Sequence, residues 1–279
     1  MALASAKKQS THGLSVKDVN LNQGFHVIAG PCSVESAEQI HTAAAHLAGL
    51  GVRILRGGAF KPRTSPHSFQ GLAEEGLRLL AQAAAKHGML TVSEVMDTET
   101  IGLVGDYVDI LQVGARNMQN FSLLKRLARQ PKPVLLKRGM AATIEEFLHA
   151  ADYVLEGNQR VILCERGVRS FDNLTRNMLD LAGVVLLRRM SALPVIVDLS
   201  HSTGRPDIVP ALARACVALG AEGIMVEVHP DPEHALCDGA QAMPLHDAAR
   251  MIADLEPWIE LRRRLEPESL VAAGNGALE

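Results

Sequence analysis

The sequence has few aromatic residues, no close pairs of cysteines and no long apolar run. Aromatic residues make up 3% of the 279 positions, which leaves few ring surfaces for stacking against single-stranded nucleic acid. The net charge of −3, with scattered basic residues, argues against nucleic acid as the main partner. No run reaches the roughly 18 apolar residues that span a bilayer, and the segment MALASAKKQSTHG lacks the apolar stretch of a secretory signal. These absences predict a cytoplasmic protein that binds neither membrane nor nucleic acid.

The four cysteines are Cys32, Cys164, Cys216 and Cys237. Their spacing fits neither a zinc ribbon nor a disulfide framework. We interpret Cys164 and Cys216 as core residues, because an unpaired cysteine commonly behaves as a small apolar side chain. Cys32 follows a strand candidate, where its position alone is compatible with a core residue or with a ligand.

What the sequence does contain is an alternation of short apolar segments with longer amphipathic ones. The strand candidates are residues 25–30, 52–57, 90–95, 109–114, 134–139, 160–167, 194–201 and 223–229. Between them lie helical segments such as 36–51, 71–88 and 143–157, each of which ends in a glycine that is typical of a helix stop. Fully apolar strands that alternate with helices indicate a parallel sheet covered on both faces.

The count of eight strands predicts an α/β fold that closes into a single (β/α)8 TIM barrel rather than an open doubly wound sheet. No G-x-G-x-x-G sequence follows the first strand, so a dinucleotide-binding fold is not indicated. We expect the barrel to cover residues 24–265, with an N-terminal extension at 1–23 and a flexible C-terminal tail at 266–279.

Polar residues fall at or just past the carboxyl ends of the predicted strands, which is the face on which barrels carry their active sites. They are Arg56, Glu94, Gln112, Lys137, Glu165, Arg166, His201 and Glu227. Structural salt bridges would account for one or two of them. Because each partly buried polar group needs a partner, their recurrence at nearly every strand indicates a ligand site.

A second group of residues could bind a metal ion. Its candidates are Cys32, His201, Glu227 and Asp238. Closure of the barrel would place the first strand beside the eighth. One thiolate, one imidazole and two carboxylates suit a divalent Mn, Fe, Co or Zn ion. The spacing leaves His229, Asp231 and His234 open as alternatives for the later ligands.

Cations are also repeated along this face. Arg56, Lys61 and Arg63 lie in ILRGGAFKPRTS (54–65), and Arg116, Lys137 and Arg166 follow other strands. Guanidinium groups bind phosphate and carboxylate oxygens in bidentate fashion, whereas lysine supplies a compact charge or a proton. The cations therefore predict a substrate with more than one anionic group.

Seven ordered motifs resemble those of a known enzyme family. They are AGPCSVES (29–36), LRGGAFKPRTSP (55–66), QVGARNMQN (112–120), LLKRGM (135–140), CERGVR (164–169), DLSHSTGR (198–205) and EVHPDPEHALCDGAQAM (227–243). Over about residues 24–265, the chain resembles the type I-beta branch of the 3-deoxy-D-arabino-heptulosonate 7-phosphate (DAHP) synthases. The resemblance implies a metal-dependent, aldol-like condensation of phosphoenolpyruvate with erythrose 4-phosphate, the first step of the shikimate pathway to aromatic amino acids.

The same resemblance implies a role for each matching residue. The metal ligands would be Cys32, His201, Glu227 and Asp238. Phosphoenolpyruvate would be bound by Arg56, Lys61, Arg116, Lys137 and Arg166, with the backbone of Gly114 and Ala115 beside its phosphate. The phosphate of erythrose 4-phosphate would be bound by Arg63, Thr64 and Ser65. We expect the catalytic residues to be Lys61, Glu94, Lys137 and His201. Lys61 or a water on the metal would be the proton donor, and Glu94 would orient that lysine or the attacking water.

Three other functions remain as alternatives. The first is a 3-deoxy-D-manno-octulosonate 8-phosphate synthase, which uses arabinose 5-phosphate, although KPRTS (61–65) favours the four-carbon sugar. The second is a Schiff-base aldolase that uses Lys137. The third is a phosphosugar-sensing barrel that binds without turnover.

The resemblance further implies a homo-oligomer, either a tetramer or a dimer. About twenty residues precede the first strand, so we expect no N-terminal regulatory domain, and any feedback control would need a separate partner. We also predict that Cys237, which adjoins Asp238, approaches Cys32 closely enough for oxidation to inactivate the enzyme through a disulfide.

Overall fold

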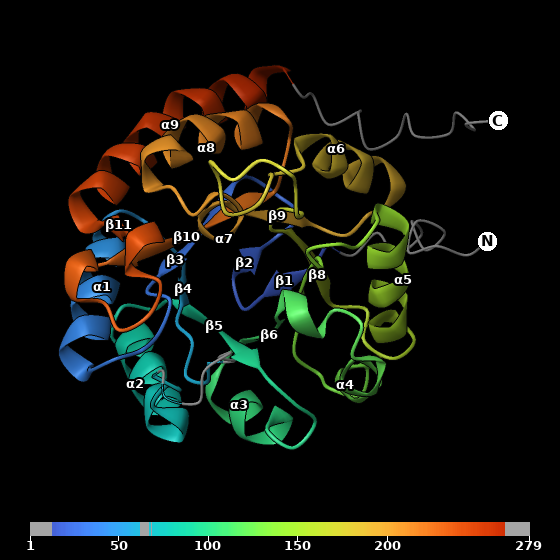
Figure 1. Cartoon of the computed structure of the whole chain (residues 1–279), viewed down its shortest axis with the longest axis horizontal. Coiled ribbons are helices and arrows are strands. Elements are labelled where there is room, and N and C mark those ends of the chain that lie inside the picture. The colour runs from blue at the N-terminus through green and yellow to red at the C-terminus, as the bar shows by residue number, and fades with distance from the viewer. Residues whose placement is uncertain (1–12, 62–66, 68, 266–279) are drawn as a thin grey trace.

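A closed barrel of parallel strands is the centre of the computed structural model, which describes residues 13–61, 67 and 69–265 (Figure 1). The barrel strands are β3 (His26–Gly30), β4 (Ile54–Arg56), β5 (Leu90–Val95), β6 (Ile110–Val113), β7 (Val134–Lys137), β8 (Val161–Glu165), β9 (Val195–Asp198) and β10 (Gly223–His229). Strand β10 pairs with both β3 and β9, which closes the ring. A short strand β11 (Met243–Pro244) extends β10. The predicted (β/α)8 barrel is confirmed, and each strand candidate contains a strand.

Helices surround the barrel in Figure 1 and cover its outer face. They are α1 (Ala37–Gly49), α2 (Ala73–Lys86), α3 (Ile101–Tyr107), α4 (Phe121–Leu127), α5 (Ile144–Leu155), α6 (Leu181–Met190), α8 (Val209–Ala218) and α9 (Leu245–Leu265). Local sequence fixes several helix starts. Helix α5 begins with a capping box in which Thr143 and Glu146 satisfy each other's backbone N–H groups. Cys216 is buried in the apolar layer between helices and strands, as predicted. No helix of the described segments is both long enough and apolar enough to cross a membrane.

The interior of the barrel holds a second apolar core. Its strand residues are Ile28, Ile54, Leu90, Val92, Ile110, Leu135, Ile162, Cys164, Ile196 and Met225. Cys164 is therefore a core residue, as predicted. Because these side chains fill the interior from the N-terminal side, ligands have room only near the carboxyl ends of the strands.

A β-hairpin seals the N-terminal end of this interior. Its strands are β1 (Ser15–Val16) and β2 (Val19–Asn20), which pair antiparallel and lie inside the ring in Figure 1. Four of its residues, Leu14, Val16, Val19 and Leu21, belong to the interior core. The sequence predicted only an extension here, because the two strands are too short to show a period of their own.

Strand register brings the polar strand ends to one level. Glu227 pairs with Gly30, and Lys137 pairs with Cys164. Gly30 permits a close approach at this level, because a Cβ atom there would lie 2.1 Å from the backbone oxygen of Arg56 and its φ of +150° disfavours other residues. Residues far apart in the chain therefore meet at the carboxyl end of the barrel.

Candidate active site

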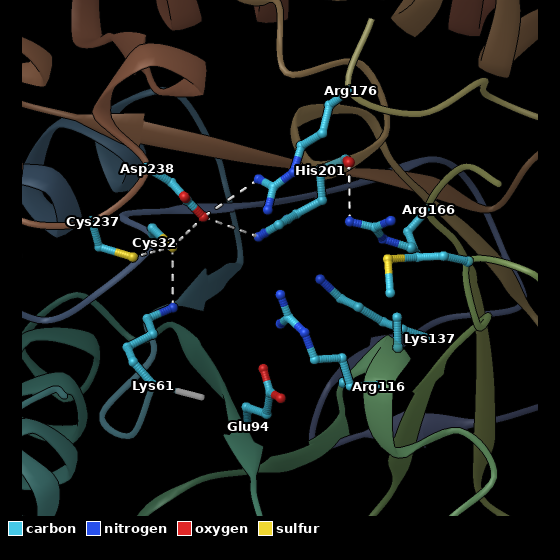
Figure 2. A pocket seen from close by; sticks show the side chains of 13 residues that line it. Cys32, Lys61, Glu94, Arg116, Lys137, Arg166, Arg176, His201, Cys237 and Asp238 are labelled. Atoms are coloured by element: carbon cyan, nitrogen blue, oxygen red, sulfur yellow. Dashed lines mark hydrogen bonds and ion pairs between the residues drawn. The ribbon is translucent and has the colours of Figure 1, made fainter. Parts of the chain in front are cut away.

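The carboxyl ends of the strands surround a pocket, shown in Figure 2. It is lined by Cys32, Lys61, Glu94, Gly114, Ala115, Arg116, Lys137, Met140, Arg166, Arg176, His201, Cys237 and Asp238. Two further predicted site residues, Arg56 and Glu227, are buried and contact members of this set. The predictions for Arg63, Thr64 and Ser65 lie outside the described residues.

Four potential metal ligands meet at one side of the pocket. Cys32, His201, Glu227 and Asp238 each offer one donor atom, and these atoms lie within 4.8 Å of one another. His201 Nε2 is 3.2 Å from Glu227 Oε1 and 4.0 Å from Asp238 Oδ2. Two ligands of one transition-metal ion are separated by up to roughly 4.5 Å. The cluster therefore fits a divalent ion after small side-chain adjustments.

The alternative ligands take no part in this cluster. His229 Nε2 lies 3.4 Å from Glu35 Oε2, and its Nδ1 accepts from the backbone N–H of Asp231. His234 is exposed and pairs with Asp231 at 2.7 Å. The side chains of these alternatives have their partners outside the pocket. The candidate metal ligands are therefore Cys32, His201, Glu227 and Asp238.

In the cluster the thiol pKa of Cys32 and the carboxyl pKa of Glu227 shift in opposite directions. The pKa of Cys32 is raised well above its ordinary value by its hydrogen bond with Cys237, by burial and by the charge of Glu227. Burial would raise the pKa of Glu227, but the charges of His201 and Arg56 hold it below its ordinary value. Arg56 Nη1 donates to Glu227 Oε1 at 2.5 Å. A metal ion that binds here would displace the thiol proton.

Cations face this cluster across the pocket. Figure 2 shows Arg116, Lys137 and Arg166 on the side opposite Cys32 and Asp238. Arg166 is 5% exposed, and its Nη1 has no hydrogen-bond partner among the described residues. Arg56 Nε is equally without a partner in the described part of the chain. An unsatisfied buried N–H group costs about 1–3 kcal/mol, so these atoms fit an anionic ligand.

Lys61 and Glu94 both line the pocket but have different partners. Lys61 Nζ is 3.1 Å from Cys32 Sγ, and although burial lowers the lysine pKa, the cysteine raises it so that the net shift is upward. Glu94 accepts a hydrogen bond from Gln112 at 3.3 Å. A Cβ atom on Gly114 would lie 2.1 Å from Glu94 Oε1, so the glycine makes room for the carboxylate.

Asp198, to which the sequence analysis assigned no role, joins two of the predicted site residues. It ends β9, is fully buried and precedes the short helix α7 (Leu199–Thr203). Its Oδ2 lies 2.8 Å from His201 Nδ1 and also accepts from Lys137 Nζ. Burial would raise its pKa, but His201 and Lys137 hold that pKa well below the ordinary value. In the sequence, Asp198 could have been recognised as a site residue because it lies at the end of a predicted strand, three residues before His201.

Arg176 was also missed by the sequence analysis. It lies in the segment between β8 and α6, and its Nη1 is 2.6 Å from Gln241 Oε1 and 3.6 Å from Asp238 Oδ2. Gln241 in turn donates to Glu227 at 2.6 Å. Because Arg176 follows the end of β8 by eleven residues, a search of strand ends does not find it.

A model of the DAHP synthetase I family matches residues 15–264. The chain belongs to this family. The chain is 51% identical, over 245 residues, to the phospho-2-dehydro-3-deoxyheptonate aldolase of Thermotoga maritima, covering 87% of the chain and 72% of the relative. It is 35% identical, over 248 residues, to a 2-dehydro-3-deoxyphosphooctonate aldolase of Thiobacillus denitrificans, covering 82% and 87%.

Solved structures agree with this membership in the DAHP synthetase I family. The crystal structure of the Thermotoga maritima DAHP synthase has a TM-score of 0.87 at 49% identity and covers 90% of this chain and 74% of that one. A truncated form of the enzyme has a TM-score of 0.84 at 45% identity and covers 90% and 92%. The resemblance predicted from the motifs is confirmed, and the DAHP synthases are closer than the octulosonate relative.

Proposed function

We propose that this member of the DAHP synthetase I family condenses phosphoenolpyruvate with erythrose 4-phosphate and water to give DAHP and inorganic phosphate. The observation that carries the proposal is a pocket in which a cluster of four metal-donor groups, three of which line the pocket, lies across from Arg116, Lys137 and Arg166. Phosphoenolpyruvate carries a carboxylate and a phosphate, and erythrose 4-phosphate carries a second phosphate. The excess of cations matches that pair of substrates.

The cations are proposed to bind phosphoenolpyruvate. Arg56, Lys61, Arg116, Lys137 and Arg166 would share its two anionic groups, with the backbone of Gly114 and Ala115 beside the phosphate. The unpartnered guanidinium nitrogens support this assignment, since an oxyanion would satisfy them by charge-assisted hydrogen bonds. Those contacts would also displace bulk water from the anionic groups of the substrate, which strengthens the charge interactions in the pocket.

The donor cluster is proposed to hold a divalent Mn, Fe, Co or Zn ion through Cys32, His201, Glu227 and Asp238. A sulfur and a nitrogen donor favour such ions over Mg²⁺ or Ca²⁺, which take oxygen ligands. When bound, the ion would supply a Lewis acid for the carbonyl oxygen of the aldehyde substrate.

The remaining chemistry is assigned to side chains. C3 of phosphoenolpyruvate would form a bond to the aldehyde carbon, and the Lys61 ammonium, on the metal side of the pocket, would give a proton to the new alkoxide. Glu94 would orient the water that adds at C2 and take its proton. The resulting hemiketal phosphate would collapse by carbon–oxygen cleavage. Arg116 and Arg166 would then stabilise charge on the departing phosphate.

A phosphate-release assay tests the proposal. Phosphate should appear only when both substrates are present, disappear with EDTA, and return with Mn²⁺, Co²⁺ or Zn²⁺. A clear preference for arabinose 5-phosphate would instead make the enzyme an octulosonate phosphate synthase, in line with the relatives at 35% identity. Activity that survives EDTA, with borohydride trapping of substrate on Lys137, would indicate a Schiff-base aldolase. Binding of both substrates without phosphate release would indicate a sensor.

A homo-oligomer, either a dimer or a tetramer, is part of the same proposal. Phe171, Leu174 and Met178 are exposed in the segment between β8 and α6. Neighbouring exposed apolar side chains are a common feature of protein interfaces. Light scattering of the purified protein measures its mass directly, and a monomer at all concentrations would contradict this part of the proposal.

A further inference from the structure

The carboxylate of Asp198 contacts one candidate metal ligand, His201, and one cation of the proposed anion site, Lys137. Asp198 is fully buried, and its two oxygens accept three hydrogen bonds. Oδ1 accepts from the backbone N–H of His201 at 3.1 Å, which caps α7. Oδ2 accepts from His201 Nδ1 at 2.8 Å and from Lys137 Nζ. Each of these bonds constrains a group that borders the pocket.

The bond to Nδ1 fixes which imidazole nitrogen can bind a metal. A carboxylate that pairs with an ammonium group, as Asp198 does with Lys137, only accepts hydrogen bonds. Nδ1 of His201 must therefore carry a proton, so in the neutral ring Nε2 has the lone pair. Nε2 is the nitrogen that faces Glu227 at 3.2 Å and Asp238 at 4.0 Å. The carboxylate thus presents the correct nitrogen to the other donors.

The bond to Lys137 fixes the cation that faces the substrate. Lys137 is 4% exposed, and a buried ammonium needs an anionic partner when no substrate is bound. Asp198 is that partner, and it holds Nζ on the pocket side of β7. The lysine can then meet an incoming anion without a search among rotamers, which lowers the entropic cost of binding.

We propose that Asp198 is a positioning residue shared by the metal site and the anion site: it holds His201 with Nε2 free and it holds the Lys137 ammonium in place. Loss of this carboxylate weakens both sites together, although they lie on different sides of the pocket. The identity of the anion as phosphoenolpyruvate rests on the proposed function, whereas the metal part does not.

Asp198→Asn is the informative substitution, because it keeps the shape but replaces one oxygen by an NH₂ donor. If the NH₂ occupies the Oδ2 position, it faces the lysine ammonium and forces a lone pair onto Nδ1, which turns Nε2–H toward the metal donors. If it occupies the Oδ1 position, it faces the backbone N–H of His201. Neither orientation preserves all three bonds.

The experiment measures two affinities on the full chain by calorimetry: Mn²⁺ for the metal-free protein, and phosphoenolpyruvate for the same protein without metal. Asp198→Asn should weaken Mn²⁺ binding by about 10–100-fold, the usual cost of losing a partner of a ligating histidine. It should also weaken phosphoenolpyruvate binding. By contrast, His201→Ala should weaken mainly the metal, and Lys137→Met mainly the anion.

The matched control is Glu222→Gln, which alters a partly buried carboxylate at the opposite end of the barrel. Glu222 accepts from the backbone of Val195 at 2.8 Å and precedes β10. This control should leave both affinities unchanged. Wild-type affinities in Asp198→Asn would overturn the inference.

A measurement on the wild type covers the case in which Asp198→Asn does not fold. Nitrogen-15 chemical shifts should show the proton of the neutral His201 ring on Nδ1 in the metal-free protein, and a proton on Nε2 would overturn the inference. Neither Mn²⁺ binding nor the tautomer requires turnover. If the wild type released no phosphate while Asp198→Asn lost Mn²⁺ affinity, the proposed function would fail and the metal part of the inference would stand.

Discussion

Mild oxidation of the metal-free protein should give a form that is inactive but more stable against thermal unfolding than the reduced protein. Cys32 Sγ and Cys237 Sγ lie 3.1 Å apart, and both residues are buried. A two-electron oxidant such as diamide would take two electrons and two protons from these thiols and join the sulfurs. Cys32 could then no longer act as a thiolate ligand, so metal binding and activity should be lost together.

The expected gain in stability follows from the length of chain that the bond would close. The two cysteines are 205 residues apart. The chain-entropy treatment of disulfides gives roughly 5 kcal/mol of stabilisation at this length. For a domain of this size, that corresponds to a rise in Tm on the order of 10 °C.

The assay combines phosphate release with calorimetric unfolding before and after oxidation, and again after reduction. Cys237→Ser should resist oxidative inactivation, whereas Cys216→Ser, which alters a buried cysteine elsewhere in the barrel, should remain as sensitive as the wild type. Prior loading with Mn²⁺ should protect the wild type. Equal sensitivity of Cys237→Ser, or an oxidised wild type with an unchanged Tm, would refute the reasoning.

Three further predictions address the hairpin, the pocket and pH. Leu21→Ala should lower the free energy of unfolding by about 2–5 kcal/mol in urea titrations, because it empties part of the interior core; an unchanged value would mean that the hairpin does not stabilise the barrel. Gly114→Ala should lower kcat/KM on the order of 100-fold, because its Cβ displaces the Glu94 carboxylate by an ångström or more; Gly102→Ala, with open space around its Cβ, is the control. Burial raises the pKa of Glu222, so the folded protein keeps that proton to higher pH than the unfolded chain does. The free energy of unfolding should therefore fall as pH rises through that range, and a Glu222→Gln variant with the same pH dependence would contradict this cause.

The barrel could be predicted because short apolar segments, typical of buried parallel strands, alternate with longer amphipathic segments in the sequence. Closure then placed Cys32 beside Glu227 and Asp238 by topology alone, before any side chain was located. The candidate site residues at strand ends were predicted for the same reason. Both predictions depend on one property of the barrel: the carboxyl ends of all eight parallel strands lie at the same end.

The missed features have no such local signal. The two-residue strands of the hairpin show no period, and their burial depends on the barrel that surrounds them. Arg176 reaches the pocket from the middle of a long connection. Asp198 could be placed at a strand end from the sequence, but its contact with Lys137 depends on how β7, β8 and β9 stagger within the ring.

The pairing of β10 with β3 also sets the order in which the protein is completed during synthesis. The edge of β3 has no β10 partner until residues 223–229 leave the ribosome. At about 5–20 residues per second, this edge remains open for roughly 10–40 s. The donor atoms of Cys32 and Asp238 cannot meet during that interval, so a metal ion cannot stabilise any nascent chain that lacks the last strand.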